Sequence, residues 1–343
     1  YVESVDFGEP SESKAVLGGY GEFHYNKLNA RDSSKDLRKA DYHRWVMFLN
    51  HEFSDRVRYF SEFELEHSLA GDGKPGEVEL EQAFIEIDLD DEHVTRTGLF
   101  LVPVGILNET HEPPTFYGVE RNDVENVILP ATWWEAGMSM GGRYESGFSW
   151  DFAVHSGLEM PTEGSKAFRV RSGRQKVANA IAKSLAYTIR GRYTGLPGLD
   201  LSASYQVQQD PSQVANDGLD SGKLINLNAI YQTGDFQIRA LWAQWHFNGA
   251  AVESANVDKQ TGWYIEPSYR FNAFERNFGT YYRYEDVEGA RVQDRFDQWQ
   301  IGFNWYPVPD VVLKVDWRNR SHDLSDQSGR DFKGFDLGVG YQF

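Results

Sequence analysis

The fold is decided at the end of the chain, where residues 331–343 read DFKGFDLGVGYQF. From Phe335 onward every second residue is apolar, and the residues between them are glycine or polar. A period of two places the apolar side chains on one face of a β-strand and the polar side chains on the other. The stretch therefore predicts a strand with one apolar face. The apolar residues are Phe335, Leu337, Val339, Tyr341 and Phe343.

The same alternation recurs along the whole chain and predicts sixteen strands. For example, Trp299, Ile301 and Phe303 share one face of a segment whose other face is mostly polar. Most of the predicted strands are about ten residues or longer, whereas strands of soluble proteins average roughly 5–6 residues and tilted strands need about 9–11 residues to cross a bilayer. The predicted strands span residues 14–25, 39–50, 56–69, 77–89, 94–103, 132–143, 146–156, 185–194, 198–208, 223–232, 235–247, 261–272, 276–286, 295–306, 310–320 and 332–343.

The connections between the predicted strands alternate in length. Those after even-numbered strands are short, such as Thr233-Gly234, and those after odd-numbered strands are longer and polar. An up-and-down antiparallel sheet places all its short turns at one end, and closure into a barrel removes its two edges. We therefore expect one all-β transmembrane barrel over residues 1–343, with residues 1–13 as an N-terminal periplasmic segment. The longer connections are 26–38, 70–76, 104–131, 157–184, 209–222, 248–260, 287–294 and 321–331.

The composition excludes several other classes of protein. The 343 residues include 34 Lys and Arg and 52 Asp and Glu, which gives a net charge of −18 and disfavours a nucleic-acid partner. Aromatic residues make up 15%, which excludes an acidic disordered chain. The longest apolar runs, such as 99–107, are shorter than the roughly 18 residues of a membrane helix. There is no cysteine, so disulfides and thiolate sites are excluded. A soluble acidic β-protein is the remaining alternative to the membrane barrel.

The chain resembles sixteen-stranded bacterial outer-membrane porins, and most closely the phosphate-selective porin O/P family. The resemblance rests on the ending Val339–Phe343, on the segment Gly98–Gly105, and on the long connection 104–131 that follows it. It implies a homotrimer in the outer membrane of a Gram-negative bacterium, in contact with the lipid bilayer and lipopolysaccharide. It also implies that the barrel-assembly machinery recognises Phe343, and that loop 104–131 folds into the barrel and narrows it.

Alternation also assigns charged residues to the lumen, because a charged side chain facing lipid is costly. The basic and acidic sets are expected on different parts of the circumference. The alternative is that many of them lie at the rims and only keep the lumen wet. The predicted basic residues are Arg58, Arg190, Arg192, Arg239, Arg270, Arg283, Lys314, Arg318 and Arg320, and Arg58 lies among the acids. The predicted acidic residues are Glu62, Glu64, Glu66, Glu86, Asp88 and Asp151.

Two long loops carry further charged residues. If loop 104–131 folds inward, its acids oppose the arginine-lined wall and create a transverse field at the constriction. This loop has no lysine, which departs from the lysine-rich constriction that the phosphate-selective family implies; it could instead be external and bind divalent cations with lipopolysaccharide. Loop 157–184 is predicted to hold a short basic helix between Arg169 and Lys183, which attracts anions, packs on the barrel or binds lipid phosphate. The predicted constriction residues are Glu109, His111, Glu112, Glu120, Arg121, Asp123 and Glu125.

Signals for an enzyme are poor. His51-Glu52 and His111-Glu112 lack the second histidine of a zinc helix, and no Gly-x-Ser-x-Gly elbow occurs. No cofactor and no metal site are predicted. The sequence therefore predicts a passive outer-membrane channel for small hydrophilic solutes and ions, with a charge-asymmetric constriction. The alternatives are a substrate-specific channel for phosphate or an organic acid, and a non-conducting structural or adhesive barrel or barrel enzyme.

Overall fold

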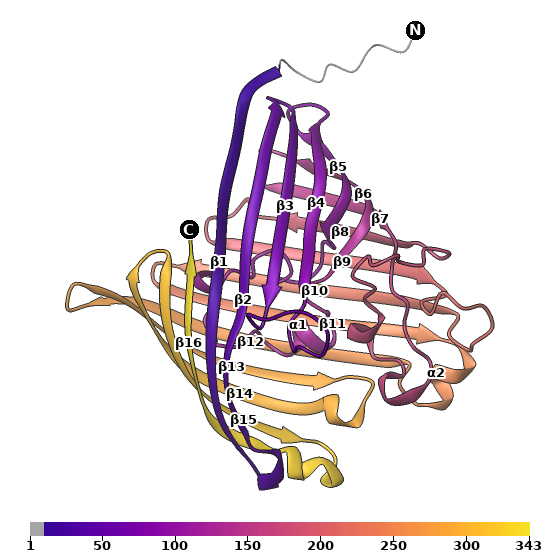
Figure 1. Cartoon of the computed structure of the whole chain (residues 1–343), viewed down its shortest axis with the longest axis vertical. Coiled ribbons are helices and arrows are strands. Elements are labelled where there is room, and N and C mark those ends of the chain that lie inside the picture. The colour runs from indigo at the N-terminus through magenta and orange to yellow at the C-terminus, as the bar shows by residue number, and fades with distance from the viewer. Residues whose placement is uncertain (1–9) are drawn as a thin grey trace.

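The structure, a computed structural model, describes residues 10–343. They form a closed barrel of sixteen strands in which every strand pairs antiparallel with its sequence neighbours and β1 pairs with β16 (Figure 1). The strands are β1 (Pro10–Ala30), β2 (Leu37–Ser54), β3 (Val57–Glu66), β4 (Val78–Asp88), β5 (His93–Leu101), β6 (Trp134–Arg143), β7 (Phe148–His155), β8 (Ala186–Tyr193), β9 (Leu199–Gln209), β10 (Ser221–Thr233), β11 (Phe236–Asn248), β12 (Lys259–Ala273), β13 (Arg276–Glu288), β14 (Arg295–Val308), β15 (Val311–His322) and β16 (Phe332–Gln342).

The predicted fold class is confirmed, and each predicted strand has its counterpart in the barrel. The largest differences are in β1, which begins at Pro10 and continues to Ala30. Its two ends pair with Ser54 of β2 and with Phe332 of β16. Residues 10–13, expected in a periplasmic segment, therefore belong to the barrel wall, whereas residues 1–9 of that expected segment lie outside the described residues.

The two faces of the wall differ as the alternation predicts. In β16, Leu337 and Val339 are 42% and 39% exposed and face outward. Asp336, the residue before Leu337, is fully buried on the lumen side, where it contacts Arg318 of β15. The apolar face therefore meets the bilayer, while the polar face is enclosed by the barrel.

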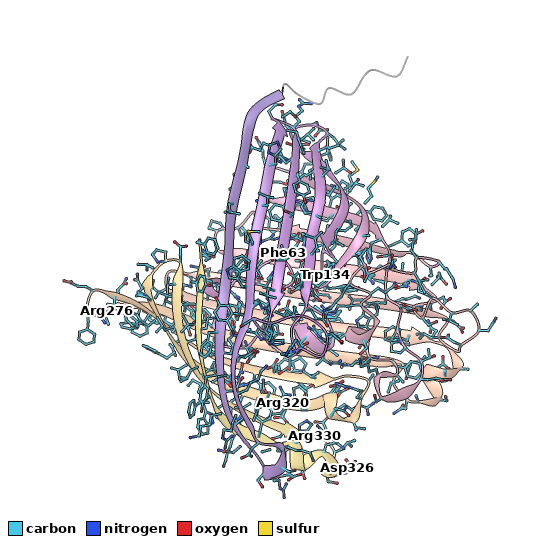
Figure 2. The ribbon with its side chains drawn as sticks, viewed as in Figure 1. Phe63, Trp134, Arg276, Arg320, Asp326 and Arg330 are labelled. Carbon is cyan, nitrogen blue, oxygen red and sulfur yellow. The ribbon has the colours of Figure 1, made fainter. Side chains whose placement is uncertain are left out.

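The helices lie in the connections and are short. They are α1 (Val124–Val127) and α2 (Ala250–Ser254), with the 3₁₀ turns η1 (Ser33–Lys35), η2 (Pro113–Thr115), η3 (Gly164–Lys166), η4 (Val170–Gly173), η5 (Val292–Asp294) and η6 (Ser325–Arg330). Among the described residues, no helix combines the length and the apolar character needed to cross a membrane. Figure 2 shows Arg276, at the β12–β13 turn, far from Asp326 and Arg330 in the β15–β16 connection at the other end of the barrel.

The basic helix expected between Arg169 and Lys183 does not form. The fourth loop, residues 156–185, has only the turns η3 and η4. Lys176 and Val177 have φ angles of 51° and 55°, in the left-handed region, which interrupts a right-handed helix. Arg171 donates a hydrogen bond of 2.6 Å to the carbonyl of Ala131, so this loop packs on the connection between β5 and β6.

Part of the barrel interior is filled by an apolar cluster that the alternation did not reveal. Residues of the β5–β6 connection, including Ile128, pack in it against the lumen face of β11. The rings of Trp245 and Phe247 in β11 are stacked 5.2 Å apart, and the Trp245 indole donates a hydrogen bond of 2.9 Å to the Ile128 carbonyl. Val170 of the fourth loop is fully buried in the same cluster. The lumen is therefore narrowed on the side of β10 to β14, where strands carry apolar residues on both faces.

Candidate functional site

The third loop, residues 102–133 between β5 and β6, lies inside the barrel. Its first half is held by three parts of the wall. The backbone N–H of Gly105 donates to Asn226 Oδ1 of β10 at 2.9 Å, and Glu109 forms an ion pair with Arg190 of β8. His111 Nε2 lies 3.2 Å from Glu62 Oε1 on β3.

The second half of the third loop crosses to the opposite strands. The ammonium of Lys314 on β15 donates to the carbonyls of Phe116 and Gly118 at 2.8 and 2.9 Å. Glu120 Oε1 lies 3.2 Å from His24 Nδ1 on β1, and Asp123 forms an ion pair with Arg320 of β15. Because contacts to β1, β3, β8, β10 and β15 surround the loop, it spans the lumen from wall to wall.

Glycines on the lumen face of β16 make room for this loop. A Cβ at Gly338 would lie 3.0 Å from a methyl of Val119, and a Cβ at Gly340 would overlap the ring of Pro113. The glycines that alternate with apolar residues in β16 thus also leave the space in which the third loop lies. A larger side chain at either glycine would push the loop away from the wall.

Glu125 in α1 anchors the third loop from within. Its Oε1 accepts hydrogen bonds from the backbone N–H groups of Ile106 and Leu107 at 2.6 and 2.7 Å. Its Oε2 accepts from Asn122 at 2.9 Å and from the Tyr264 hydroxyl of β12 at 3.1 Å. Burial raises the pKa of Glu125 although these four hydrogen bonds favour the charged form. The sequence indicated a pore-facing acid, but Glu125 is only 1% exposed and holds the loop's backbone.

The other third-loop residues expected at the constriction have different positions. Arg121 donates to the Thr132 hydroxyl at 3.0 Å and to the His111 carbonyl at 3.3 Å, so it ties the loop to itself. Glu112 directly precedes the η2 turn and is half-buried. Glu109 and Asp123 are ion-paired with the wall, as described above.

The basic residues of β12 to β15 do not form the bare wall that the sequence indicated. Arg283 Nη1 lies 3.1 Å from Glu266 Oε2, and Arg318 is paired with Asp336. Arg320 is paired with Asp123 of the third loop. The opposite charges therefore touch one another, whereas the predicted transverse field requires them to face each other across an open gap.

Two further arginines of the predicted set differ in accessibility. Arg239 of β11 donates to the Thr115 carbonyl of the third loop at 2.8 Å. Arg270, near the short-turn end of β12, is exposed, and its guanidinium lies 4.2 Å from the centre of the Tyr306 ring. Arg270 thus belongs to a rim, as the alternative interpretation proposes, while Arg239 supports the third loop.

The acidic residues of β3 form a buried polar band with groups that the sequence interpretation missed. Glu62 accepts from Gln82 at 2.7 Å, and Glu64 Oε1 lies 3.7 Å from Arg44 Nε. The same guanidinium lies 2.7 Å from Glu22 Oε1 on β1. Arg44 and Glu22 occupy lumen-facing positions of β2 and β1, where the alternation used for the other strands would have found them. Glu66 belongs to a cluster of three neighbouring carboxylates with Glu64 and Glu79, whose oxygens lie within 4.8 Å of one another.

Water-accessible spaces lie on both sides of the third loop. At the short-turn end, three neighbouring cavities of about 500, 290 and 600 Å³ are lined by charged side chains. At the long-loop end, a cavity of about 450 Å³ is lined by residues of β1, β2, β15 and the third loop. The charged residues that line the short-turn cavities include Arg58, Glu86, Asp88, Arg96, Glu109, Arg143, Arg190, Arg192 and Asp200.

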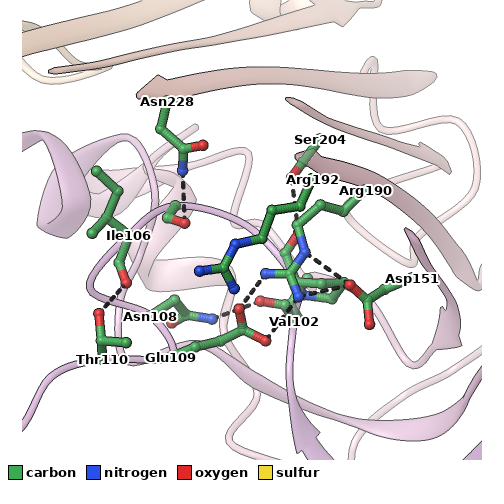
Figure 3. Close-up of polar contacts among 12 residues, drawn as sticks. Val102, Ile106, Asn108, Glu109, Thr110, Asp151, Arg190, Arg192, Ser204 and Asn228 are labelled. Carbon is green, nitrogen blue, oxygen red and sulfur yellow. Dashed lines mark hydrogen bonds and ion pairs between the residues drawn. The ribbon is translucent and has the colours of Figure 1, made fainter. Parts of the chain in front are cut away.

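Arg190 and Arg192 at the short-turn end are paired with carboxylates. Arg190 lies between Asp151 and Glu109, with 2.7 Å from its Nη2 to Asp151 Oδ2 (Figure 3). Arg192 Nε donates to Asp200 at 2.9 Å. Such bidentate and shared pairs hold the guanidinium groups against the wall.

A second group of paired charges lines β3 to β5. Arg58 donates to Glu86 at 3.1 Å and to Asp88 at 2.7 Å, and Arg96 donates to the other oxygen of Glu86 at 2.7 Å. These residues face one another directly across neighbouring strands. On this part of the short-turn end, basic and acidic groups therefore lie in direct contact with each other.

Residues 136–343 match the family model described as Gram-negative porin. The chain belongs to the Gram-negative porin family. An uncharacterized protein of Aquifex aeolicus (strain VF5) is 28% identical over 351 aligned positions, which cover 92% of this chain and 77% of that protein.

Solved structures share the fold of this porin at low sequence identity. The anion-selective porin from Comamonas acidovorans superposes with a TM-score of 0.66 at 13% identity and covers 97% of this chain and 100% of its own. Salmonella typhi OmpF gives 0.64 at 14% identity, with 96% and 98% covered. The channel DcaP of Acinetobacter baumannii gives 0.62 at 14% identity, with 98% and 99% covered. This porin is therefore a channel of the Gram-negative outer membrane and not an enzyme.

Proposed function

We propose that this porin is a passive, weakly ion-selective channel for small hydrophilic solutes, with the third loop as its constriction. The observation that carries the proposal is the position of that loop, which separates the water-accessible spaces at the two ends of the barrel and is bound to the wall on both sides. Solutes would cross beside the loop, through polar groups that offer hydrogen bonds in place of water.

Weak ion selectivity is supported by the pairing of charges at the short-turn end. Six arginines line these cavities, and five of them contact at least one carboxylate: Arg58, Arg96, Arg143, Arg190 and Arg192. A permeating anion would have to compete with these carboxylates for the guanidinium groups. The resemblance to the phosphate-selective porin O/P family implies selective passage of phosphate. Lys314 does not support this, because its ammonium is buried and binds carbonyls of the third loop.

A homotrimer in lipid is the proposed assembly. The apolar outer face supports contact with the bilayer, and one structural relative, OmpT of Vibrio cholerae, is described in a trimer form. Phe343 is 62% exposed at the end of β16, which supports the proposed recognition by the barrel-assembly machinery. Binding of lipopolysaccharide at the long-loop end stays part of this proposal.

Planar-bilayer recording under a salt gradient tests the proposed function. We expect open-channel conductance with a small reversal potential for the wild type. Glu109→Gln should shift the reversal potential toward anions, because it leaves Arg190 with Asp151 as its remaining carboxylate partner. Glu275→Gln makes the same charge change at the exposed β12–β13 turn and serves as the matched control.

Each outcome of this recording bears on one candidate function. Absence of conductance in correctly folded protein would favour the non-conducting barrel. Strong anion preference in the wild type would favour the substrate-specific anion channel. Equal reversal potentials for Glu109→Gln and Glu275→Gln would show that the solute path does not pass Glu109.

A further inference from the structure

Three histidines that are far apart in the sequence meet on the lumen wall near the long-loop end. The rings of His24 on β1 and His43 on β2 are stacked with their centres 4.7 Å apart. The ring of His67, just beyond β3, lies 5.4 Å from that of His43 at an angle of 73°. The sequence indicated no metal site, because these histidines are 19 and 24 residues apart and match no short metal-binding motif.

Asp41 brings two of these imidazoles to one carboxylate. His67 Nδ1 lies 2.9 Å from both carboxylate oxygens of Asp41, and His43 Nδ1 lies 3.2 Å from Asp41 Oδ2. The ligand atoms of Asp41, His43 and His67 all lie within 4.8 Å of one another. Zinc bonds of about 2.0–2.1 Å in a tetrahedral site separate neighbouring ligand atoms by roughly 3.3 Å, so small side-chain movements would admit an ion.

The backbone holds this arrangement in place. The register of β1 and β2 shifts between Glu22 and Phe23, which leaves His43 as an extra residue of a bulge on β2. A bulge re-aims side chains, and here His43 shares the lumen face with Asp41 and Arg44. The N–H of His67 donates to the carbonyl of His43 at 3.0 Å. The φ angle of His67 is 52°, a left-handed conformation that is uncommon for a residue other than glycine.

The ligand set favours a divalent transition-metal cation, and the site can be reached from one cavity. Asp41 and His43 line the cavity of about 450 Å³ at the long-loop end, so an ion from the external solution can reach them. Lys39 Nζ lies 2.7 Å from Asp41 Oδ2 and is 45% exposed, so it can swing into solvent when an ion binds. Two neutral imidazoles with one carboxylate are a ligand set typical of zinc and other transition metals, and unlike the all-oxygen sets of Mg²⁺ and Ca²⁺.

We propose that Asp41, His43 and His67 form a binding site for one divalent transition-metal ion, with zinc as the preferred ion. The bound ion adds positive charge to the wall of the long-loop cavity and joins β2 to the chain that follows β3. A second group, His24, His43 and Glu120, shares His43 with the first. Glu120 is already bound by Asn26 at 2.9 Å and faces His24, so the proposal places the ion at Asp41.

Isothermal titration of the metal-stripped, detergent-solubilised full chain with ZnCl₂ tests this proposal without any measurement of conductance. We expect one Zn²⁺ per chain with micromolar or tighter affinity, and no saturable binding of Mg²⁺. His43→Asn and His67→Asn should each weaken Zn²⁺ binding at least 30-fold. His246→Asn, on the outward face of β11, is the matched control and should change the affinity by less than threefold.

Two further results decide the ligand set. Glu120→Gln should leave the affinity within threefold, and a 30-fold loss in this variant with normal binding by His67→Asn would overturn the assignment to Asp41. Wild-type protein without saturable Zn²⁺ binding, or His43→Asn with wild-type affinity, would overturn the site altogether. Since His67 lies outside the strands, His67→Asn is expected to fold, and an unchanged β-sheet circular dichroism spectrum checks this.

Discussion

Replacement of Glu125 by alanine should release the third loop from its position in the lumen. The change removes the acceptor for the N–H groups of Ile106 and Leu107, which are both buried. A buried donor left without a partner costs about 1–3 kcal/mol, so two such groups cost about 2–6 kcal/mol. Since each 1.4 kcal/mol is a factor of ten, the population with a displaced loop should rise about 30-fold to 10⁴-fold.

The assay for this prediction is single-channel recording with polyethylene glycols of increasing size. Glu125→Ala should give noisier current, larger mean conductance and a larger size cutoff than the wild type. Glu125→Gln is the comparison variant: its side-chain carbonyl can still accept both N–H bonds, but its amide N–H₂ cannot accept from Asn122, so its effect on the current should be smaller than that of Glu125→Ala. The same conductance, noise and cutoff for Glu125→Ala and the wild type in a correctly folded barrel would refute the anchoring role of Glu125.

Two other substitutions separate supporting residues from accessible ones. Gly340→Leu should displace Pro113 and raise the conductance. Gly334→Leu lies on the same face of β16 but against the backbone of β1, and it should impair folding instead. If both variants fold and change the conductance alike, the proposed contact between Gly340 and Pro113 is contradicted. Arg283→Met should destabilise the barrel by about 3–5 kcal/mol in urea unfolding, because it leaves Glu266 buried without its partner. Arg270→Met should be nearly neutral, because Arg270 is exposed. Equal unfolding midpoints for the two variants would contradict the assignment of Arg283 to the buried wall and of Arg270 to the rim.

The barrel could be predicted from the sequence because two independent patterns agree. Alternation sets the strands, as in Leu337 and Val339 of β16, and the alternating length of the connections sets their order. Both patterns lie within short stretches of sequence, so they can be recognised without knowledge of the tertiary structure. The end of β1 at Ala30 was missed because Asn26, Lys27 and Asn29 interrupt the apolar alternation, although these residues still pair with β16.

The interior was harder to predict because its contacts join distant parts of the chain. Trp245 and Phe247 occupy lumen positions that would be polar in an empty barrel, and they are apolar because the third loop covers them. The charge of Glu125 marks it as polar, but only the fold shows that it caps two backbone N–H groups. His43 faces the lumen beside Arg44 through a bulge, which a strict period of two cannot place.

The central claim, that the third loop lies inside the barrel against β16, can be tested by a disulfide. The chain has no cysteine, so introduced thiols have no competitors. In the structure, Val119 Cβ lies 3.6 Å from the position of a Cβ at Gly338, close to the roughly 3.8 Å of a natural disulfide. Val119→Cys with Gly338→Cys should cross-link under mild oxidation in the folded barrel, as measured by mass spectrometry. Absence of this cross-link, or equal cross-linking of Val119→Cys with Leu337→Cys on the lipid face, would contradict the account.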